Sequence, residues 1–279
     1  MVAGIPVLVA VPAQVTSATP LVIMYHGFGP PNSPRALAKV LAPIPGAVTA
    51  YPPLPLFGGR APPGGTDELV RRQNEDYIGL LLFPAISGAA REMSVLTATL
   101  SESYGLSKSR PVVIFGFSAG GAAALLSLTA TNIQPRAVLV LNAPLSINEA
   151  VDGFERQTGK RYLWTEAAKE ASLHYDVVKD ADKIATSNPD TAMLLVQSEQ
   201  DRGFSPATTQ AAALTLSASF TAHGRRSEIG EVTLPGSDHY VLDAASSASE
   251  HPEANMIAAQ AMISHWLRTH AFNGGSDCS

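Results

Sequence analysis

The sequence predicts an α/β fold built on a parallel sheet. Apolar segments short enough for strands alternate along the chain with longer segments of helical composition. Several strand segments, such as residues 112–117 and 137–141, are unbroken runs rich in Val, Leu and Ile. Such runs are typical of parallel strands covered on both faces, and the helical segments between them supply the crossovers that parallel strands need.

The same patterns assign the elements in chain order. We expect strands at residues 5–11, 21–25, 47–51, 112–117, 137–141, 192–197 and 228–234. We expect helices at residues 35–41, 68–82, 87–104, 119–129, 206–220 and 252–269. The chain has no internal repeat and no long linker, so residues 1–272 are expected to form a single domain and residues 273–279 a disordered tail.

Two segments interrupt the alternation of strands and helices. Residues 51–65 are dense in Pro and Gly (PPLPLFGGRAPPGG) and are expected to form a rigid loop. Residues 145–190 form a long connection that sets four aromatic side chains in a polar, helix-prone background: Phe154, Tyr162, Trp164 and Tyr175. Two interpretations of this connection remain open, an ordinary crossover with aromatic packing and a small cap over the site.

The composition excludes several classes of function. With 279 residues, 46% of them hydrophobic, the chain can bury one large core. A net charge of −5 and a charged fraction of 15% give no basic surface for nucleic acid. The one cysteine, Cys278, allows neither an internal disulfide framework nor a cysteine-based metal site, and we expect no metal and no cofactor.

The apolar N-terminus does not match a signal peptide. Residues 1–12 lack a basic start, and Pro6 and Pro12 interrupt them. The alternation of valine with other apolar residues over residues 7–11 favours an edge strand. No apolar run approaches the length of a membrane span, so we expect a soluble, cytoplasmic protein with no membrane partner.

The strongest functional signal is a serine between glycines at the end of a buried strand. The run Gly116-Phe117-Ser118-Ala119-Gly120 has the pattern G-x-S-x-G, and an Ala-rich helix follows it. A turn this tight holds the serine in a strained backbone conformation, and the positions two before and two after it must lack a Cβ. The strain lifts Oγ above the sheet edge, and the helix points its N-terminal amides at the same place. Ser118 is therefore the candidate nucleophile.

Acyl transfer also needs two N–H groups that stabilise the developing oxyanion. The amide of Ala119, directly after the serine, is one candidate. The strand at residues 21–25 ends in His26-Gly27-Phe28-Gly29, where glycines let the backbone turn and present an amide inward, and the amide of Phe28 is the other candidate. His26 itself is expected to be structural and to fix this loop by hydrogen bonds.

Loops at the carboxyl ends of the later strands supply an acid and a base. Asp201 follows the strand at residues 192–197 and is the preferred acid, with Glu199 as the alternative. His239 follows the last expected strand and has an intrinsic pKa near neutrality, so it is the preferred base. Asp238 beside it is expected to stabilise the turn, because adjacent loop residues rarely point the same way.

The order Ser118, Asp201, His239 resembles the order of nucleophile, acid and histidine in the α/β-hydrolase superfamily of serine esterases. The resemblance extends over nearly the whole chain, from HGFG through GFSAGG to the loops of Asp201 and His239. It implies a mostly parallel sheet of about eight strands with helices on both faces and, where a cap is present, its insertion after the strand at residues 137–141. Residues 51–60 (YPPLPLFGGR) resemble the P-x-x-x-x-G-x-R loop of compact bacterial dienelactone-hydrolase-like and prolyl-oligopeptidase-like esterases.

Differences from the motifs of other α/β-hydrolase subfamilies limit which subfamily this sequence resembles. HGFG stands where hormone-sensitive-lipase-like enzymes have HGGG, and only seven strands can be placed. A serine nucleophile argues against the dehalogenase and epoxide-hydrolase reactions, which need Asp at that position. No β-propeller precedes the catalytic region in this sequence, so an oligopeptidase gate is not expected.

Together these residues predict a serine hydrolase that cleaves a small-molecule carboxylic ester of short to medium acyl chain through an acyl-enzyme. Phe117, Leu145 and Phe204 are expected to line the substrate pocket, together with the ring of Phe28. One alternative keeps the triad and changes the substrate to a thioester, lactone or amide. Another is a non-catalytic binding protein on the same scaffold. The sequence leaves the oligomeric state open.

Overall fold

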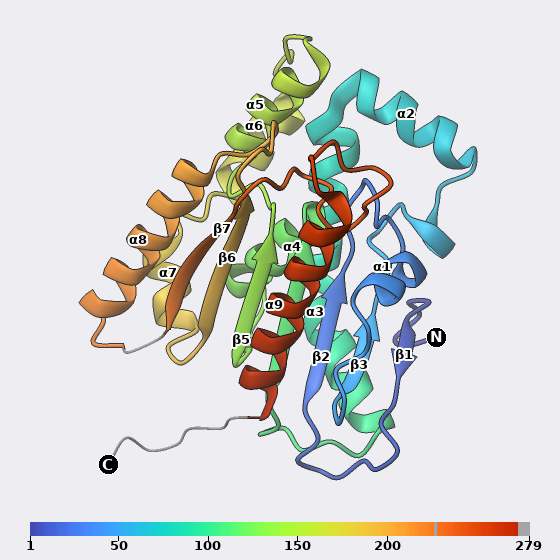
Figure 1. Ribbon diagram of the computed structural model, residues 1–279, viewed down its shortest axis with the longest axis vertical. Coiled ribbons are helices and arrows are strands. Elements are labelled where there is room, and N and C mark those ends of the chain that lie inside the picture. Colours follow the sequence, from blue (N-terminus) through green and yellow to red (C-terminus); the bar gives the residue numbers. More distant parts are fainter. Residues whose placement is uncertain (226–227, 273–279) are drawn as a thin grey trace.

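A computed structural model describes residues 1–225 and 228–272, and over these residues seven strands form one sheet in the order β1-β3-β2-β4-β5-β6-β7 (Figure 1). Strand β1 pairs with β3 in the antiparallel sense, and all the other neighbours are parallel. The strands are β1 (Leu8–Ala10), β2 (Leu21–Tyr25), β3 (Val48–Tyr51), β4 (Val112–Phe117), β5 (Ala137–Leu141), β6 (Ala192–Ser198) and β7 (Ile229–Leu234). The predicted mostly parallel α/β fold is therefore confirmed, and the predicted tail at residues 273–279 lies outside the described residues.

The strands lie where the sequence predicts them, although the described residues form seven rather than about eight. The first strand is shorter than predicted, because β1 covers only Leu8–Ala10 of the expected residues 5–11. Pro6 and Pro12 flank it, and proline has no N–H to donate to a neighbouring strand. Prolines on both sides therefore limit pairing at this edge of the sheet.

Helices cover both faces of the sheet. On one face lie α3 (Phe83–Ser103), α4 (Ala119–Ala130) and α8 (Pro206–Ala222), and on the other lie α1 (Pro34–Val40) and α9 (Pro252–Phe272). Side chains of β2 alternate between the faces: Leu21 and Ile23 face α3 and α4, whereas Val22 faces α1 and α9. This alternation buries both sides of the sheet.

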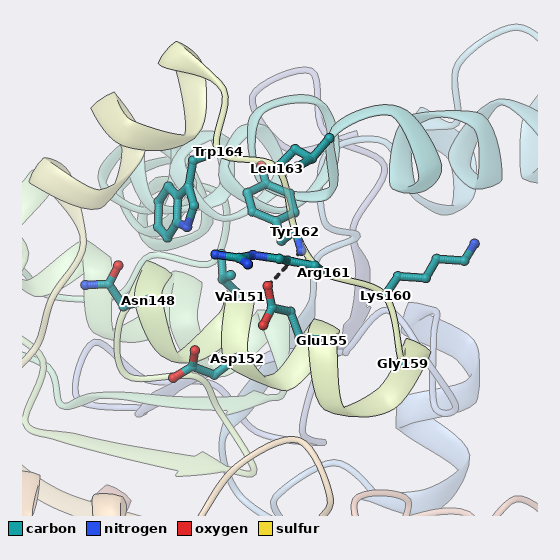
Figure 2. Close-up of a pocket in the computed structure, with 10 residues that line it drawn as sticks. All are labelled: Asn148, Val151, Asp152, Glu155, Gly159, Lys160, Arg161, Tyr162, Leu163 and Trp164. Atoms are coloured by element: carbon teal, nitrogen blue, oxygen red, sulfur yellow. Dashed lines mark hydrogen bonds between the residues drawn. The ribbon is translucent and has the colours of Figure 1, made fainter.

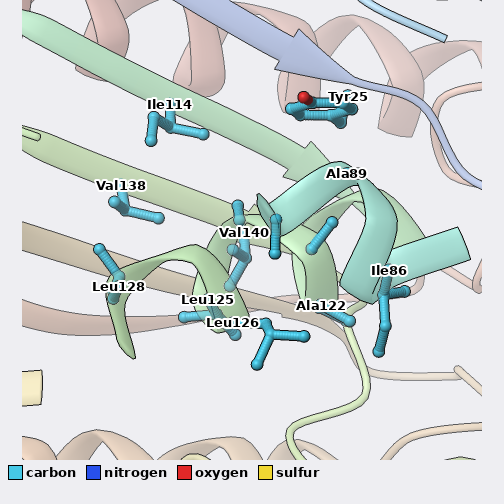
Figure 3. Close-up of a cluster of buried hydrophobic side chains, with 14 of the residues drawn as sticks. Tyr25, Ile86, Ala89, Ile114, Ala122, Leu125, Leu126, Leu128, Val138 and Val140 are labelled. Carbon is cyan, nitrogen blue, oxygen red and sulfur yellow. The ribbon is translucent and has the colours of Figure 1, made fainter. Parts of the chain in front are cut away.

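A buried cluster of hydrophobic side chains lies under α4. Its buried Ala122 and Leu125 pack on Ile114, Val138 and Val140 from β4 and β5 (Figure 3). Small residues along α4 allow the helix to lie close to the strands. The helix that follows Ser118 is in this way fixed on the centre of the sheet.

Residues 65–103 form one helical segment rather than the two separate helices predicted at 68–82 and 87–104. Helix α2 (Gly65–Asp76) continues through a π-helical turn (Tyr77–Leu82) into α3. Pro84 falls in the first turn of α3, where a missing N–H is tolerated. The π-helical turn changes the hydrogen-bonding register, so the proline does not end the helix.

By length and composition, the helical segment Gly65–Ser103 meets the criterion for a membrane span, with a mean hydropathy of 1.3 over its most apolar stretch. This differs from the prediction that no apolar run reaches such a length. Half of that stretch (50%) is buried inside the protein, and long core helices meet the same criterion.

The connection between β5 and β6 contains three helices that the sequence did not delimit: α5 (Ile147–Thr158), α6 (Glu166–His174) and α7 (Ala181–Ser187). Helix α7 packs against α4 and α8, while α5 and α6 lie at the end of the sheet where the parallel strands finish (Figure 1). The carboxylate of Asp76 connects the loop between α5 and α6 to the π-helical turn. It accepts hydrogen bonds from Tyr162 Oη and Thr165 Oγ1 (2.6 Å) in that loop and from the Gly79 N–H (2.7 Å) in the turn.

His26 joins the end of β2 to the Pro- and Gly-rich loop. Its Nε2 accepts a hydrogen bond from the Leu54 N–H (3.2 Å), so Nδ1 carries the proton and donates to the Gly27 carbonyl (2.8 Å). The ring is fully buried, and burial lowers the pKa of His26 to about 4. The predicted structural role of His26 is therefore confirmed, and it depends on a neutral ring.

This arrangement predicts a pH-dependent stability. In the unfolded chain His26 has its ordinary pKa of 6.5, so between pH 6.5 and 4 the unfolded state binds a proton that the folded state does not. The free energy of unfolding should be fully present above pH 6.5 and should fall by up to about 3 kcal/mol as the pH drops toward 4. Urea denaturation at a series of pH values measures this. His26→Gln should flatten the dependence, whereas replacing the exposed His265 by Gln should not; parallel profiles for all three proteins would contradict the account.

Candidate active site

Ser118 occupies a strained turn between β4 and α4. Its backbone has φ of 53° and ψ of −121°, and its N–H donates to the Leu141 carbonyl (2.8 Å). A Cβ at Gly120 would lie 2.5 Å from the His26 carbonyl oxygen, and one at Gly116 would overlap the backbone of Gly120. The turn therefore closes only because both flanking positions lack a Cβ, as the sequence predicts.

Ser118, His239 and Asp201 form one line of hydrogen bonds. The Nε2 atom of His239 lies 3.1 Å from Ser118 Oγ, and its Nδ1 lies 2.7 Å from Asp201 Oδ2. Because the carboxylate can only accept, Nδ1 carries the proton and Nε2 is free to accept the serine hydroxyl proton. The structure thus brings together three residues that lie far apart in the sequence.

The carboxylate of Asp201 is fully buried and well satisfied. Its Oδ1 accepts the N–H groups of Gly203 (2.7 Å) and Phe204 (3.2 Å), and its Oδ2 accepts Gln197 Nε2 (3.0 Å) in addition to His239. These donors stabilise the charge where water is excluded. They also fix which oxygen faces the imidazole.

The two rival acids have other partners. Glu199 accepts the Gly236 N–H (2.8 Å) and holds the loop that leads to His239. Asp238 accepts the N–H groups of Tyr240 (3.0 Å) and Ala248 (2.5 Å), which is the turn-stabilising role predicted for it. Asp201 is the acid that contacts His239.

Two residues that position His239 and Asp201 were not predicted from the sequence. Asn142 follows β5 with a φ of 50°, and its side chain donates to the His239 carbonyl (3.1 Å) and accepts the Ser198 N–H (2.8 Å). Gln197, near the end of β6, donates to Asp201. The sequence does contain a signal for both, because each is a polar residue at the carboxyl end of a buried parallel strand.

Two backbone amides beside Ser118 have no acceptor among the described residues. They are the N–H groups of Phe28 and Ala119, the latter being the first residue of α4, where no intrahelical acceptor exists. Both residues line the same cavity as Ser118. The wall of this cavity therefore includes two residues whose N–H groups have no acceptor among the described residues, as an oxyanion site requires.

The cavity over Ser118, here named the Ser118 cavity, has a volume of about 260 Å³. Its wall includes aromatic rings from separate parts of the chain, those of Phe28, Tyr77, Phe154, Phe204 and Tyr240. Of the four residues predicted to line the pocket, Phe28 and Phe204 do so. Phe117 points to the opposite face of β4 and packs with the α9 side of the core, and Leu145 is buried beneath α5, so the prediction was wrong for both.

Helix α5 forms one side of the Ser118 cavity and is anchored at its start. Ser146 Oγ accepts the Glu149 N–H (3.1 Å), and Glu149 Oε2 accepts the Leu145 N–H (2.7 Å), which is a variant of the capping box. Burial raises the pKa of Glu149 to about 7, so the group is partly protonated near neutrality. Gly153 then lets α5 approach the Asp201 loop, since a Cβ there would lie 2.8 Å from the Gly203 carbonyl oxygen.

The described residues contain no group of three or more His, Cys, Asp or Glu side chains arranged to hold a metal ion.

Comparisons with known proteins agree with this architecture. The structure is similar to the TT1662 protein of Thermus thermophilus, with a TM-score of 0.66, 17% identity and coverage of 95% of each chain. It is also similar to Est1E of Butyrivibrio proteoclasticus, solved with ferulic acid (TM-score 0.58, 15% identity, 94% and 96% covered). A third similar structure is a putative dienelactone hydrolase of Klebsiella pneumoniae (TM-score 0.53, 17% identity, 94% and 92% covered).

No curated protein sequence matches the chain. Residues 93–271, which include Ser118, Asp201 and His239, match the prolyl oligopeptidase family. Since this match spans more than half of the sequence, the chain belongs to the prolyl oligopeptidase family, within the α/β-hydrolase fold.

Proposed function

We propose that this protein hydrolyses carboxylic esters of short to medium acyl length through an acyl-enzyme on Ser118. Its family and its structural relatives support a hydrolase, and the choice of ester is our own step. The observation that carries the proposal is the unbroken line from Asp201 through His239 to Ser118, with two free amides beside it. This combination supplies a base, a nucleophile and an oxyanion site together.

In the first half of the reaction, Ser118 Oγ attacks the ester carbonyl carbon while its proton passes to His239 Nε2. The carbonyl oxygen becomes an oxyanion and receives hydrogen bonds from the N–H groups of Phe28 and Ala119. Asp201 stabilises the imidazolium that forms. The C–O bond to the alcohol then breaks, and His239 returns the proton to the departing oxygen, which leaves the acyl group on Ser118.

In the second half, water replaces the alcohol. His239 accepts a proton from the water as its oxygen attacks the acyl carbon, and the same two amides hold the second oxyanion. Collapse breaks the bond to Ser118 Oγ, which regains its proton from His239. One ester and one water thus give one acid and one alcohol.

The dimensions of the Ser118 cavity support a confined acyl group. Its volume of about 260 Å³ is at the small end for ligand pockets, and aromatic rings form much of its wall. We propose that residues 145–190 act as a small cap, because α5 lines this cavity. Helix α7, in the same connection, packs against α4 and α8 and so attaches the cap to the helices that cover the sheet.

Amide hydrolysis is the second candidate. It is favoured by the family match, since the family is named for an oligopeptidase, and the same triad can protonate a departing amine. Parallel assays of p-nitrophenyl acetate and p-nitroacetanilide separate the two, because they differ only in the leaving atom.

Substitutions at the triad test the assignment of roles. Ser118→Ala should lower kcat for p-nitrophenyl acetate by at least about 100,000-fold, because the nucleophile is lost. Asp201→Asn should lower it by about 10,000-fold, because the imidazole would hold the wrong tautomer. Glu199→Gln is the matched control and should leave kcat nearly unchanged. An active Ser118→Ala protein, or equal losses in the two acid variants, would refute the assignment; circular dichroism and thermal unfolding verify that each variant is folded.

The size of the Ser118 cavity predicts the chain-length preference. Across p-nitrophenyl esters from acetate to palmitate, kcat/KM should peak at short acyl chains and fall steeply for long ones, because a long chain does not fit about 260 Å³. Initial rates at substrate concentrations well below KM measure this. A maximum at palmitate would be incompatible with a confined acyl pocket.

A further inference from the structure

A second cavity adjoins the Ser118 cavity on the side of His239. It has a volume of about 450 Å³ and is named here the Arg202 cavity. It shares Gln157, His239 and Tyr240 with the Ser118 cavity but contains neither Ser118 nor Ala119. The two spaces therefore meet at the imidazole.

The Arg202 cavity has polar and apolar lining in similar amounts, and two of the residues that line it are arginines, Arg156 and Arg202. Arg156 is held in place, since it donates to the carbonyls of Arg202 (3.2 Å) and Gly203 (2.7 Å). Within residues 1–225 and 228–272, neither arginine forms an ion pair with a carboxylate.

One carboxylate also lines this cavity, and it already accepts hydrogen bonds from the protein. It belongs to Asp238, and each of its oxygens accepts a backbone N–H. Among the residues that line this cavity, two arginines accompany one carboxylate, and this lining favours an anion. A carboxylate fits best, because guanidinium groups bind it with paired hydrogen bonds.

The position of the cavity determines which part of a substrate enters it. His239 must donate its proton to the departing oxygen, so the leaving group has to lie beside the imidazole. The acyl carbon is bonded to Ser118, and the acyl group extends into the Ser118 cavity. The space that contains His239 but not Ser118 is therefore the one open to the alcohol.

We propose that the Arg202 cavity binds the alcohol part of the substrate and selects alcohols that carry a carboxylate. This inference rests on the ester hydrolysis proposed above and adds a substrate class to it. Arg202 determines specificity, and Arg156 supports it from a position fixed by the backbone of the Asp201 loop.

A larger hollow on the protein provides a control. It has a volume of about 990 Å³, shares no lining residue with the Ser118 cavity, and presents Lys160 and Arg161 on the loop after α5 (Figure 2). A cation there cannot contact a substrate bound to Ser118. Arg161→Gln therefore removes one positive charge from the same region of the chain without changing the site.

The experiment compares two substrates of nearly the same shape, one with a negative charge and one without, 3-acetoxybenzoate and its neutral amide, 3-acetoxybenzamide. For the wild-type protein kcat/KM should be up to about fivefold higher for the carboxylate, because Arg202 is exposed and solvent weakens its attraction for an anion. Arg202→Gln should bring the two values within about twofold of each other by lowering only the carboxylate value, and Arg202→Glu should favour the amide. Arg161→Gln should leave both values unchanged.

The outcomes separate the two proposals. Hydrolysis of both esters with no preference, or a preference that survives Arg202→Gln, would overturn the specificity while leaving the esterase intact. Failure to hydrolyse either ester or p-nitrophenyl acetate would overturn the proposed function and the specificity with it. Unchanged activity of the Arg202 variants on 3-acetoxybenzamide shows that they are folded.

Discussion

The structure of this site depends on the backbone conformation at Ser118. A serine with a positive φ is strained by roughly 1–3 kcal/mol, and the surrounding packing has to hold it there. Three features do so: the hydrogen bond from the Ser118 N–H to β5, the glycines on either side, and the burial of α4 on the sheet. Because the turn is fixed, the hydroxyl of Ser118 and the N–H of Ala119 occupy set positions before any substrate binds.

The rest of the site is assembled from that turn by polar side chains at one edge of the sheet. Asn142, directly after β5, and Gln197, near the end of the neighbouring β6, form hydrogen bonds with the loops of His239 and Asp201. The pairing of β5 with β6 thus places these two side chains near both loops. A buried carboxylate with several donors resists reorientation, so the imidazole keeps one tautomer and one orientation.

Much of the fold is visible in the sequence because the strands are buried on both faces and read as apolar runs. The triad residues were predictable for a related reason: each follows a strand, and parallel strands deliver their carboxyl ends to one edge. The helices between β5 and β6 were not delimited, because their mixed composition does not distinguish a crossover from a cap. The merger of two predicted helices depended on a π-helical turn stabilised by Asp76, whose partners Tyr162 and Thr165 lie far along the chain.

The lining of the cavity was the least predictable part of the site. Phe117 was assigned to the pocket by its closeness to Ser118 in sequence, yet alternation along β4 turns its ring to the other face. Tyr77 and Phe154, which stack with ring centroids 5.0 Å apart, come from the π-helical turn and α5. Their contact depends on the position of α5 at the end of the sheet, and no local pattern in a single sequence specifies that position.

The most direct test of the account is to trap the acyl-enzyme. Rapid mixing with excess p-nitrophenyl acetate, acid quenching and peptide mass spectrometry would measure where the acetyl group resides and how much of it accumulates. The account predicts a burst of p-nitrophenolate up to one equivalent of enzyme and one acetyl group on the peptide that contains Ser118. A burst with no acetylated peptide, or with the acetyl group on another residue, would contradict it.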